Sequence, residues 1–472
     1  MTKRRPGGTL IFVGIVGLAA GVAFAGGSRL RTHLPEHVLR RERMQLAQAA
    51  QPKGPGMNIP GSGGAVKAAD EDDVGMDPLG TFLSVYKAVN ENYVDQLPDK
   101  RKMAHGAVRA MLADLNDPNS RFLEKEEREA LEAEGRGRFA GIGTALSVLG
   151  HKQDGYTEYK ITVISPLPGS PGEKAGLKPG DVITHVDGKW VLGADPYIAA
   201  QKIAKKLQSR DATEEDFQKA VEAAETRIKG GITITAALKK LTLGENEKRT
   251  VTVQRAGAAQ TPAREMTTAI TQVQPVSSKT LAGGVGYIRL TAFTENAGSA
   301  FKEALATLPR GNGLVLDLRG NPGGLLAPVK EIAGLLTKGG NLLTEELPGG
   351  KRRQIALPVA NAAATRPTVV LVDRGTASSA EALATLLRDK KFGTLLGGRT
   401  FGDAMVQTLY PLADGTAYTL TTGKLLGPGA GTGWQSVGLA PGVPAAGTEE
   451  QVIARAISTL KSRVTAQAAR RS

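Results

Sequence analysis

The feature that most constrains the fold of this chain is a regular alternation of short apolar runs with longer amphipathic segments beyond Pro275. The short runs have the length and composition of buried strands, and the longer segments repeat their apolar residues at helical spacing. The expected strands cover 284–290, 313–318, 368–372 and 393–397, and the expected helices cover 297–305, 326–336 and 380–388. This βα alternation predicts a sheet that is covered by helices.

Two different patterns precede that alternation. Between residues 79 and 134 apolar residues recur at helical spacing, which predicts two or three helices. From Phe139 short β-like runs take over at 141–148, 159–164 and 181–186, and a strand pair follows at 232–238 and 249–253. Inside this β-rich part, residues 196–230 are charged and helical in pattern, and Thr213 with Asp216 predicts a helix N-terminal cap.

A chain of 472 residues is too long for one hydrophobic core and predicts two or three domains. The expected fold class is α/β multidomain, with N-terminal helices, a β-rich domain with a helical insertion, and an α/β core. The predicted segments are 1–27, a signal peptide or membrane anchor; 28–77, a basic segment and linker; 78–138, helical; 139–256, β-rich with inserted helices at about 196–230; 274–448, the α/β core; and 449–472, a basic helix and tail.

The N-terminus has the pattern of an export signal. Three basic residues at 3–5 precede an uncharged run from Gly7 to Gly27, which ends in the small-residue sequence 23–25 (AFA). Cleavage after Ala25 would make this run a signal peptide; since about 20 apolar residues are enough to span a bilayer, a retained run would instead be an anchor. Either way we expect the bulk of the chain to be exported, periplasmic or otherwise extracytoplasmic, with the inner membrane as the site of a retained anchor.

The charge distribution favours a membrane surface over nucleic acid as a contact of the chain ends. The net charge is +14, and most of the excess lies in residues 1–48 and in the last eighteen residues, which contain no acid. The middle of the chain is nearly balanced and poor in aromatic residues, so we expect no nucleic-acid groove. The chain has no Cys, which excludes disulfides, thiolate metal sites and Cys nucleophiles, and no motif predicts a metal or another cofactor. No oligomeric state follows from the sequence.

A candidate nucleophile lies at 375–381 (GTASSAE), directly after the expected strand 368–372 and before the expected helix 380–388. A Ser at a strand-to-helix turn presents its hydroxyl at the carboxyl edge of a sheet, close to helix N–H groups that favour developing negative charge. The alternative is that Ser378 or Ser379 only caps the helix. Glu381, in the first turn, fits either a helix-start acid or a member of a hydrogen-bond network.

A second candidate loop lies at 317–324 (DLRGNPGG), after the expected strand 313–318. Gly323 and Gly324 follow a proline, and glycines let backbone N–H groups approach a ligand closely, as an oxyanion hole requires. A tight βα turn without a binding role is the alternative.

Taken together, these motifs closely resemble the carboxyl-terminal processing peptidases, the tail-specific serine protease family. The resemblance covers about residues 79–448 and depends on ordered motifs along that whole stretch. The further motifs are 93–95 (YVD), 115–123 (LNDPNSRFL), 139–143 (FAGIG), 170–181 (SPGEKAGLKPGD), 286–290 (GYIRL) with Phe293, and 398–402 (GRTFG) with Gln407. It implies N-terminal helices, a PDZ domain in the β-rich part and a protease core, without a cofactor.

The resemblance also implies a set of site residues. Members of the family use a Ser–Lys dyad, in which a Lys deprotonates the Ser and a nearby Gln supports the Lys. On this chain Ser378 matches the nucleophile and Gln407 matches the supporting Gln. The backbone N–H of Ser379, with that of Gly323 or Gly324, would form the oxyanion hole. The position of the family's Lys is occupied by Asp403.

Asp403 predicts impaired catalysis. A carboxylate with a solution pKa near 4 is a poor base for a Ser hydroxyl at neutral pH, and its charge opposes a nearby oxyanion. No His can take over easily, because all five (33, 37, 105, 151 and 185) precede the core. Lys390, Lys391 or Lys424 could substitute, although Lys424 stands where the family commonly has a basic residue and is better explained as structural.

The PDZ-like part predicts a second site. Family PDZ domains bind the C-terminal strand of a ligand at a sheet edge and hold its carboxylate on backbone N–H groups, and residues Gly141, Ile142 and Gly143 resemble that carboxylate loop. The alternative is a PDZ domain that packs only against its own core. Two functions follow. One is an exported serine endopeptidase that acts on protein C-termini, and the other is an inactive homologue that binds C-terminal tails as a scaffold or regulator.

Overall fold

The computed structural model describes residues 77–97, 99–153, 155–209, 211–258, 261–337, 339–357, 366–428 and 433–469. The chain divides into two compact units, Met1–Asn116 and Asp117–Ser472. The predicted export signal or anchor and nearly all of the predicted linker lie outside the described residues. Within the described ranges, no helix is both long enough and apolar enough to cross a bilayer.

The described part of the first unit consists of helices α3 (Pro78–Asn92) and α4 (Lys100–Ala113). Each begins with an Asp cap: Asp77 accepts the backbone N–H of Leu79, and Asp99 accepts that of Arg101. The Asp side chains thereby satisfy N–H groups that a helix start leaves without a partner. The helical spacing in the sequence is thus confirmed for this stretch.

The centre of the second unit is a six-stranded sheet. Its strands in spatial order are β11 (Val276–Leu281), β12 (Val285–Leu290), β13 (Leu314–Asp317), β16 (Thr368–Val372), β17 (Gly393–Gly397) and β20 (Val443–Pro444). Strand β11 is antiparallel to its neighbour, and all other pairs are parallel. The single turn η1 (Ala282–Gly284) joins β11 to β12. This sheet confirms the predicted βα alternation.

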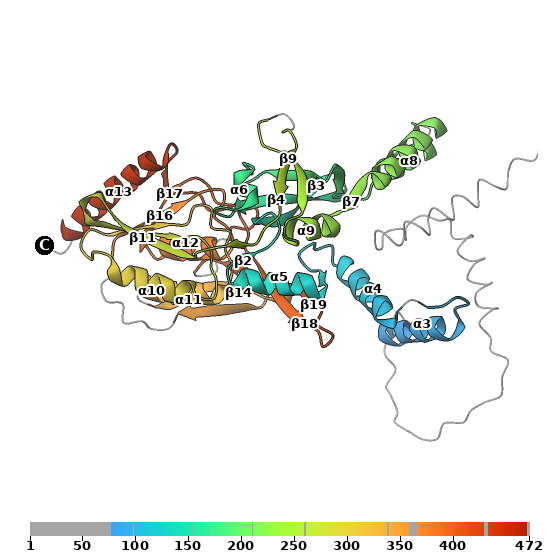
Figure 1. The fold of residues 1–472 in the computed structure, drawn as a ribbon, viewed down its shortest axis with the longest axis horizontal. Coiled ribbons are helices and arrows are strands. Elements are labelled where there is room, and N and C mark those ends of the chain that lie inside the picture. Colours follow the sequence, from blue (N-terminus) through green and yellow to red (C-terminus); the bar gives the residue numbers. More distant parts are fainter. Residues whose placement is uncertain are drawn as a thin grey trace, which may run out of the picture. The chain divides into compact units, whose positions relative to one another are not determined.

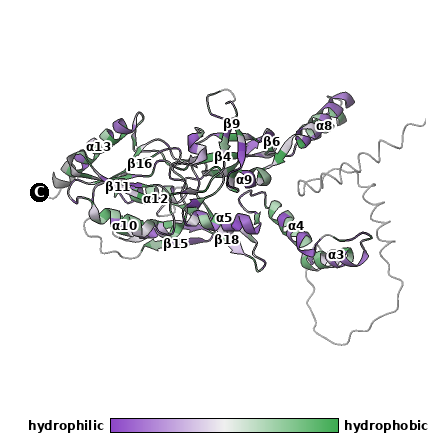
Figure 2. Ribbon diagram, viewed as in Figure 1, coloured by the Kyte–Doolittle hydropathy of each residue, from purple (hydrophilic) through white to green (hydrophobic). Residues whose placement is uncertain are grey.

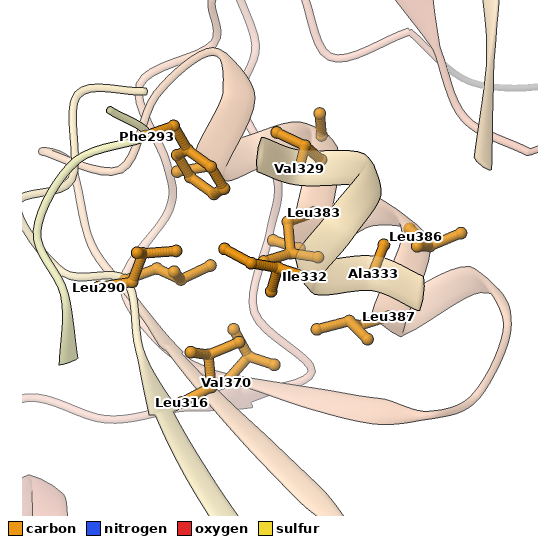
Figure 3. Packing of buried hydrophobic residues seen from close by; sticks show 14 of the residues in the cluster. Leu290, Phe293, Leu316, Val329, Ile332, Ala333, Val370, Leu383, Leu386 and Leu387 are labelled. Atoms are coloured by element: carbon orange, nitrogen blue, oxygen red, sulfur yellow. The ribbon is translucent and has the colours of Figure 1, made fainter. Parts of the chain in front are cut away.

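Helices cover both faces of this sheet (Figure 1). One face carries α10 (Ala297–Thr307), α11 (Leu326–Leu336) and α12 (Ser379–Asp389), and the other carries α13 (Glu449–Ala469). Side chains alternate along β16: Val370 packs toward α11 and α12, as Figure 3 shows, whereas Val369 packs toward α13. A strand buried on both faces reads as a continuous apolar run, which is why 368–372 is so evident in the sequence.

A five-stranded sheet adjoins this core. It contains β1 (Phe122–Leu123), β14 (Gly340–Glu346), β15 (Arg352–Leu357), β18 (Met405–Pro411) and β19 (Ala417–Leu426), with the turn η2 (Pro348–Gly350) between β14 and β15. Helix α5 (Lys125–Gly135) follows β1 and so belongs to the second unit, not to the unit of α3 and α4. The short strands β2 (Arg138–Phe139) and β10 (Thr271–Gln272) pair with each other.

The β-rich part forms a seven-stranded sheet with its own core. Its strands are β3 (Thr144–Gln153), β4 (Tyr156–Pro166), β5 (Val182–Val186), β6 (Lys189–Leu192), β7 (Gly231–Thr233), β8 (Lys248–Gln254) and β9 (Arg264–Thr267), and its short helices are α6 (Pro171–Lys174) and α9 (Ile234–Thr242). Buried side chains of β4, β5 and β8 pack with those of α9.

Two further helices, α7 (Ile198–Gln208) and α8 (Glu214–Lys229), connect β6 to β7. Thr213 and Glu214–Asp216 start α8 with a capping box, in which Thr213 accepts the N–H of Asp216 and Asp216 accepts that of Thr213. The predicted cap is confirmed. Figure 2 shows many hydrophilic residues on α8, in keeping with the charged pattern of this stretch.

One predicted strand is wrong. Residues 232–238 do not form a strand, because α9 begins at Ile234 after the three-residue strand β7. The Thr233 hydroxyl accepts the N–H of Ala236, and Ala237, Leu238 and Leu241 are buried at helical spacing. Short apolar runs do not distinguish a strand from a buried helix, so the tertiary packing decided the outcome.

Candidate active site

Ser378 lies at the turn between β16 and α12, in a backbone conformation that side chains rarely adopt. Its φ is +50° and its ψ is −118°. A non-glycine residue in such a region costs about 1–3 kcal/mol and persists where the surrounding structure imposes it. A sharp, strained strand-to-helix turn is also the way in which some hydrolases expose a nucleophilic Ser. Ser378 is therefore a candidate nucleophile on geometry as well as on residue type.

Gly323 packs directly against this turn. Its φ is +99°, and a Cβ at this position would lie 2.8 Å from the Cβ of Ser378 and 3.0 Å from the backbone nitrogen of Ser379. Only glycine fits there. Its own N–H donates to Oδ1 of Asn321 at 2.8 Å, and the buried Asn321 side chain donates to the carbonyl of Leu290 at 2.8 Å. The Gly323 N–H is therefore already paired within the chain.

Gly324 and Ser379 leave their backbone N–H groups open. Ser379 Oγ donates to the carbonyl of Gly324 at 2.7 Å, which ties the glycine loop to the first turn of α12. Among the described residues, we find no acceptor for the backbone N–H of Gly324 or of Ser379. Of the three predicted oxyanion-hole donors, these two are available in this structure, and Gly323 is not.

Glu381 organises the two loops that carry Ser378 and Asp403. Its buried carboxylate accepts the Thr400 hydroxyl and the backbone N–H groups of Gly402 at 2.8 Å, Asp403 at 2.8 Å and Ser378 at 3.0 Å. Burial raises the pKa of Glu381 to about 7, although all four hydrogen bonds favour the charged form. Both interpretations of Glu381 are confirmed, because it is the acid in the first turn of α12, in a capping box with Ser378, and also a member of a hydrogen-bond network.

Asp403 lies beside the Ser378 turn. The N–H of Phe401 donates to the carbonyl of Thr376 at 2.9 Å, so residues 401–403 run along residues 376–378. The Asp403 carboxylate accepts one hydrogen bond, from the N–H of Met405 at 3.2 Å. Burial raises its pKa, and the Met405 hydrogen bond partly opposes that rise. Within the described residues, no Lys, Arg or His forms an ion pair with it.

The other predicted site residues are spread along neighbouring elements. Gln407 is exposed on β18 and donates through Nε2 to the hydroxyl of Thr421 at 2.8 Å. Lys390 and Lys391 follow the far end of α12, about 16 Å along the helix axis from its start. Lys424 lies on β19 opposite Met405. The first two lysines are therefore too remote to serve as a base for Ser378.

Two of the three N–H groups of the predicted carboxylate loop are bonded within the chain, and that of Gly143 has no acceptor among the described residues. The N–H of Gly141 donates to the carbonyl of Gly244 at 3.3 Å, and that of Ile142 donates to the carbonyl of Leu241 at 2.8 Å. Both acceptors lie in or just after the last turn of α9. The carbonyl of Gly143 accepts the N–H of Leu167. A ligand carboxylate could use the Gly141 and Ile142 N–H groups only by displacing these bonds.

Sequence reasoning missed the roles of Asn321 and Thr400, which position the two loops through hydrogen bonds within the chain. An Asn between an apolar strand and a Gly-Gly pair was the available sequence signal for Asn321, which the structure shows to be buried and hydrogen-bonded. Thr400 had no signal beyond its place in 398–402. No group of three His, Asp or Glu side chains in the described part of the chain could hold a metal ion.

Comparisons with known proteins place these features in context. Residues 284–445 match the family described as "Peptidase family S41", and residues 162–211 match the PDZ domain. The first stretch contains both candidate loops and Asp403, and the second runs from β4 to just beyond α7.

Similar whole proteins carry consistent descriptions. The chain is 32% identical over 382 residues to the chloroplastic C-terminal processing peptidase of Tetradesmus obliquus, covering 77% of this chain and 76% of that protein. It is 30% identical over 364 residues to the carboxy-terminal processing protease CtpA of Bacillus subtilis, covering 76% and 67%. The solved structure of a photosystem II D1 C-terminal processing protease superposes with a TM-score of 0.53 at 27% identity, covering 79% of this chain and 95% of that chain.

Proposed function

The chain belongs to peptidase family S41, the carboxyl-terminal processing peptidases, and we propose that it is an exported member that acts on protein C-termini recognised by its PDZ domain. In this proposal Ser378 is the nucleophile, and the backbone N–H groups of Ser379 and Gly324 bind the oxyanion. Gln407 is the counterpart of the Gln that supports the dyad Lys in the family. Hydrolysis is impaired because Asp403 stands in the position of the dyad Lys.

The observation that carries the proposal is the conformation of the Ser378 turn. A residue with φ +50° and ψ −118°, held by Glu381 on one side and by Gly323 on the other, is a costly feature for a simple helix cap. The open N–H groups of Gly324 and Ser379 add the donors that a tetrahedral intermediate needs. Both features support acyl-transfer chemistry.

Asp403 sets the limit on that chemistry. Burial raises its pKa, which makes it a stronger base than a solvated carboxylate, but its negative charge opposes an oxyanion nearby. Lys424 is the one earlier candidate base that is not at the far end of α12. We therefore propose slow acylation of Ser378, with Lys424 as the residue to mutate first if turnover is efficient.

The alternative is an inactive homologue that binds C-terminal tails as a scaffold or regulator. Asp403 is the observation that favours it, because a tail can be bound without a base. For both functions we propose the segments predicted above, from a signal peptide or anchor at 1–27 to the core at 274–448, an extracytoplasmic location, and contact of the N-terminal segment with the membrane if it is retained.

The test is proteolysis of an unfolded protein with an apolar C-terminus, with the full chain compared with Ser378→Ala and Asp403→Lys. We expect weak cleavage by the unmodified chain, none by Ser378→Ala, and a gain for Asp403→Lys on the order of 10²–10⁴-fold, the usual contribution of a positioned general base. The product sizes, read by mass spectrometry, show whether cuts lie near the C-terminus.

The outcomes separate the two functions. An inert chain with an active Asp403→Lys variant would support tail binding without cleavage. Efficient cleavage that Ser378→Ala abolishes and Lys424→Gln also abolishes would show a relocated base. Cleavage that survives Ser378→Ala would refute the proposed nucleophile.

A further inference from the structure

Asp403 is a partly buried carboxylate that forms no ion pair within the described residues. Asp181, Asp317 and Glu345 are at most 3% exposed, and each is paired with an arginine: Asp181 with Arg255 at 2.7 Å, Asp317 with Arg319 at 2.5 Å, and Glu345 with Arg353 at 2.6 Å. Ionised carboxylates removed from water need such compensation. The protein follows this rule at three sites.

Glu381 follows the rule in another way, because four hydrogen-bond donors surround it. Asp403 has a single donor, the N–H of Met405 at 3.2 Å, which can satisfy only a part of its acceptor capacity. Lys424 lies on the neighbouring strand opposite Met405 but forms no ion pair with Asp403. The described residues therefore give the carboxylate at 403 this one hydrogen bond and no ion pair.

The main chain of residue 403 lies next to the Ser378 turn of the proposed site. One carboxylate oxygen of Glu381, Oε2, accepts the backbone N–H of both Ser378 and Asp403. We therefore expect a polypeptide bound at Ser378 to pass close to residue 403. A cationic side chain of that polypeptide would supply the partner that the chain itself lacks.

We propose that Asp403 forms a cation-binding subsite beside Ser378, which selects bound polypeptides with a Lys or Arg side chain near the bond held at Ser378. That a polypeptide is bound at Ser378 rests on the proposed function. That Asp403 binds a cation does not depend on it. The cation serves specificity and not proton transfer, because pairing with a carboxylate stabilises the protonated form of an amine. A metal ion is a poor fit, since Asp403 has no second or third ligand among the described residues.

The test uses two diphenyl phosphonate probes that differ only in one side chain, lysine or norleucine, next to the phosphorus. In the labelling step Ser378 Oγ forms a bond to phosphorus, one phenoxide leaves, and the hydroxyl proton is released to solvent or to the phenoxide. Labelling of the full chain is followed by intact mass. We expect the lysine probe to react faster by on the order of tenfold, as a charged hydrogen bond provides.

Variants assign the preference to Asp403. Asp403→Asn keeps the shape and removes the charge, so the preference should fall to about onefold, meaning equal rates. Glu222→Gln, on the exposed surface of α8, removes the same charge elsewhere and should leave the preference intact. Equal rates for the two probes in the unmodified chain, or a preference that survives Asp403→Asn, would overturn the proposal.

A second measurement keeps the cation subsite testable if no probe labels Ser378, which would count against the proposed nucleophile alone. The fluorescent cation 4-aminobenzamidine is titrated into the full chain and into Asp403→Asn. Binding that the substitution abolishes supports the subsite, and equal or absent binding in the two proteins refutes it.

Discussion

Two glycine loops of this protein present backbone N–H groups close to a helix, and they differ in whether those groups are free. In the S41 core, Gly324 and Ser379 keep their N–H groups unpaired next to Ser378. In the PDZ part, the N–H groups of Gly141 and Ile142 are bonded to carbonyls at the end of α9. The core loop thus offers two unpaired N–H groups, whereas the PDZ loop offers only that of Gly143 until its internal bonds are exchanged.

The difference shows that a glycine motif specifies the backbone shape of a loop but not whether its N–H groups are free to bind a ligand. That depends on which hydrogen-bond acceptors the rest of the fold places next to the loop. At the core, Asn321 takes the Gly323 N–H and Glu381 takes the Ser378 N–H, so the groups left over are those that face no acceptor. At the PDZ loop, the last turn of α9 supplies acceptors of its own, since the final carbonyls of a helix lack partners within the helix.

The largest effect is expected from removing the Glu381 carboxylate, whose hydrogen bonds position the loops that carry Ser378 and Asp403. Burial raises the pKa of Glu381 from its usual 4.5 to about 7. The folded state therefore binds a proton that the unfolded state releases, and stability is highest below pH 4.5 and falls as the pH rises toward 7. In Glu381→Gln this loss, about 1.4 kcal/mol per pKa unit, should disappear from urea unfolding curves measured across that range.

Glu134 serves as the matched control. Burial raises its pKa to about 7 as well, although nearby Arg121 opposes the rise, and it lies on α5 and takes no part in the hydrogen bonds that join Ser378, Gly324 and Ser379. Glu134→Gln should flatten the same pH window without changing fluorophosphonate labelling of Ser378. An unchanged pH profile in Glu381→Gln would mean that Glu381 is ionised at little cost, and the open loop would then need another explanation.

A smaller effect is expected from closing the core loop sterically. In Gly323→Ala the new methyl group would lie 2.8 Å from the Cβ of Ser378 and 3.0 Å from the carbonyl of Ala377, so we expect a loss of about 1–3 kcal/mol and slower labelling of Ser378. Gly155→Ala is the control, with φ +87° and open space around its Cβ, and should show only the backbone cost. Equal effects of the two changes on labelling would contradict the close packing at Ser378.

The smallest effect is expected at the PDZ loop. A tail peptide with a free carboxylate and the same peptide with a terminal amide should bind the full chain with affinities that differ by only about threefold, because the carboxylate gains little where two of the three N–H groups are already bonded. Fluorescence anisotropy with a labelled apolar peptide measures this ratio. A preference for the carboxylate of a hundredfold would show that the end of α9 moves away on binding.

The sequence predicted best the strands and helices that are buried on both faces of the sheet. It predicted least the hydrogen bonds between backbone groups that are distant in sequence. The strand at 368–372 and the helix after Ser378 were predictable, because apolar runs and turn residues are local signals. The strand predicted at 232–238 was wrong because a short apolar run is ambiguous. The resemblance to the family placed Ser378, Asp403 and Gln407, whose roles stay predictions.

The hydrogen bonds that distinguish the two loops had no such signal. The N–H of Ile142 and its acceptor Leu241 are far apart in the sequence, and any residue can supply a backbone group. Glu381 was visible as a first-turn acid, but its reach to Thr400 and Gly402 depends on how β17 and the loop after it return to α12. Such contacts are set by tertiary structure, which one sequence does not display.

Glu381 binds the main-chain N–H of residue 403 and not the side chain of residue 403, and this matters for how the site can change in evolution. Every amino acid except proline offers that N–H, so a mutation at 403 exchanges the functional group beside Ser378 without requiring a compensating change in the loop. A lineage in which an amine at 403 were the base could exchange it for a carboxylate, and exchange it back, without rebuilding this loop. The architecture would make such an exchange reversible.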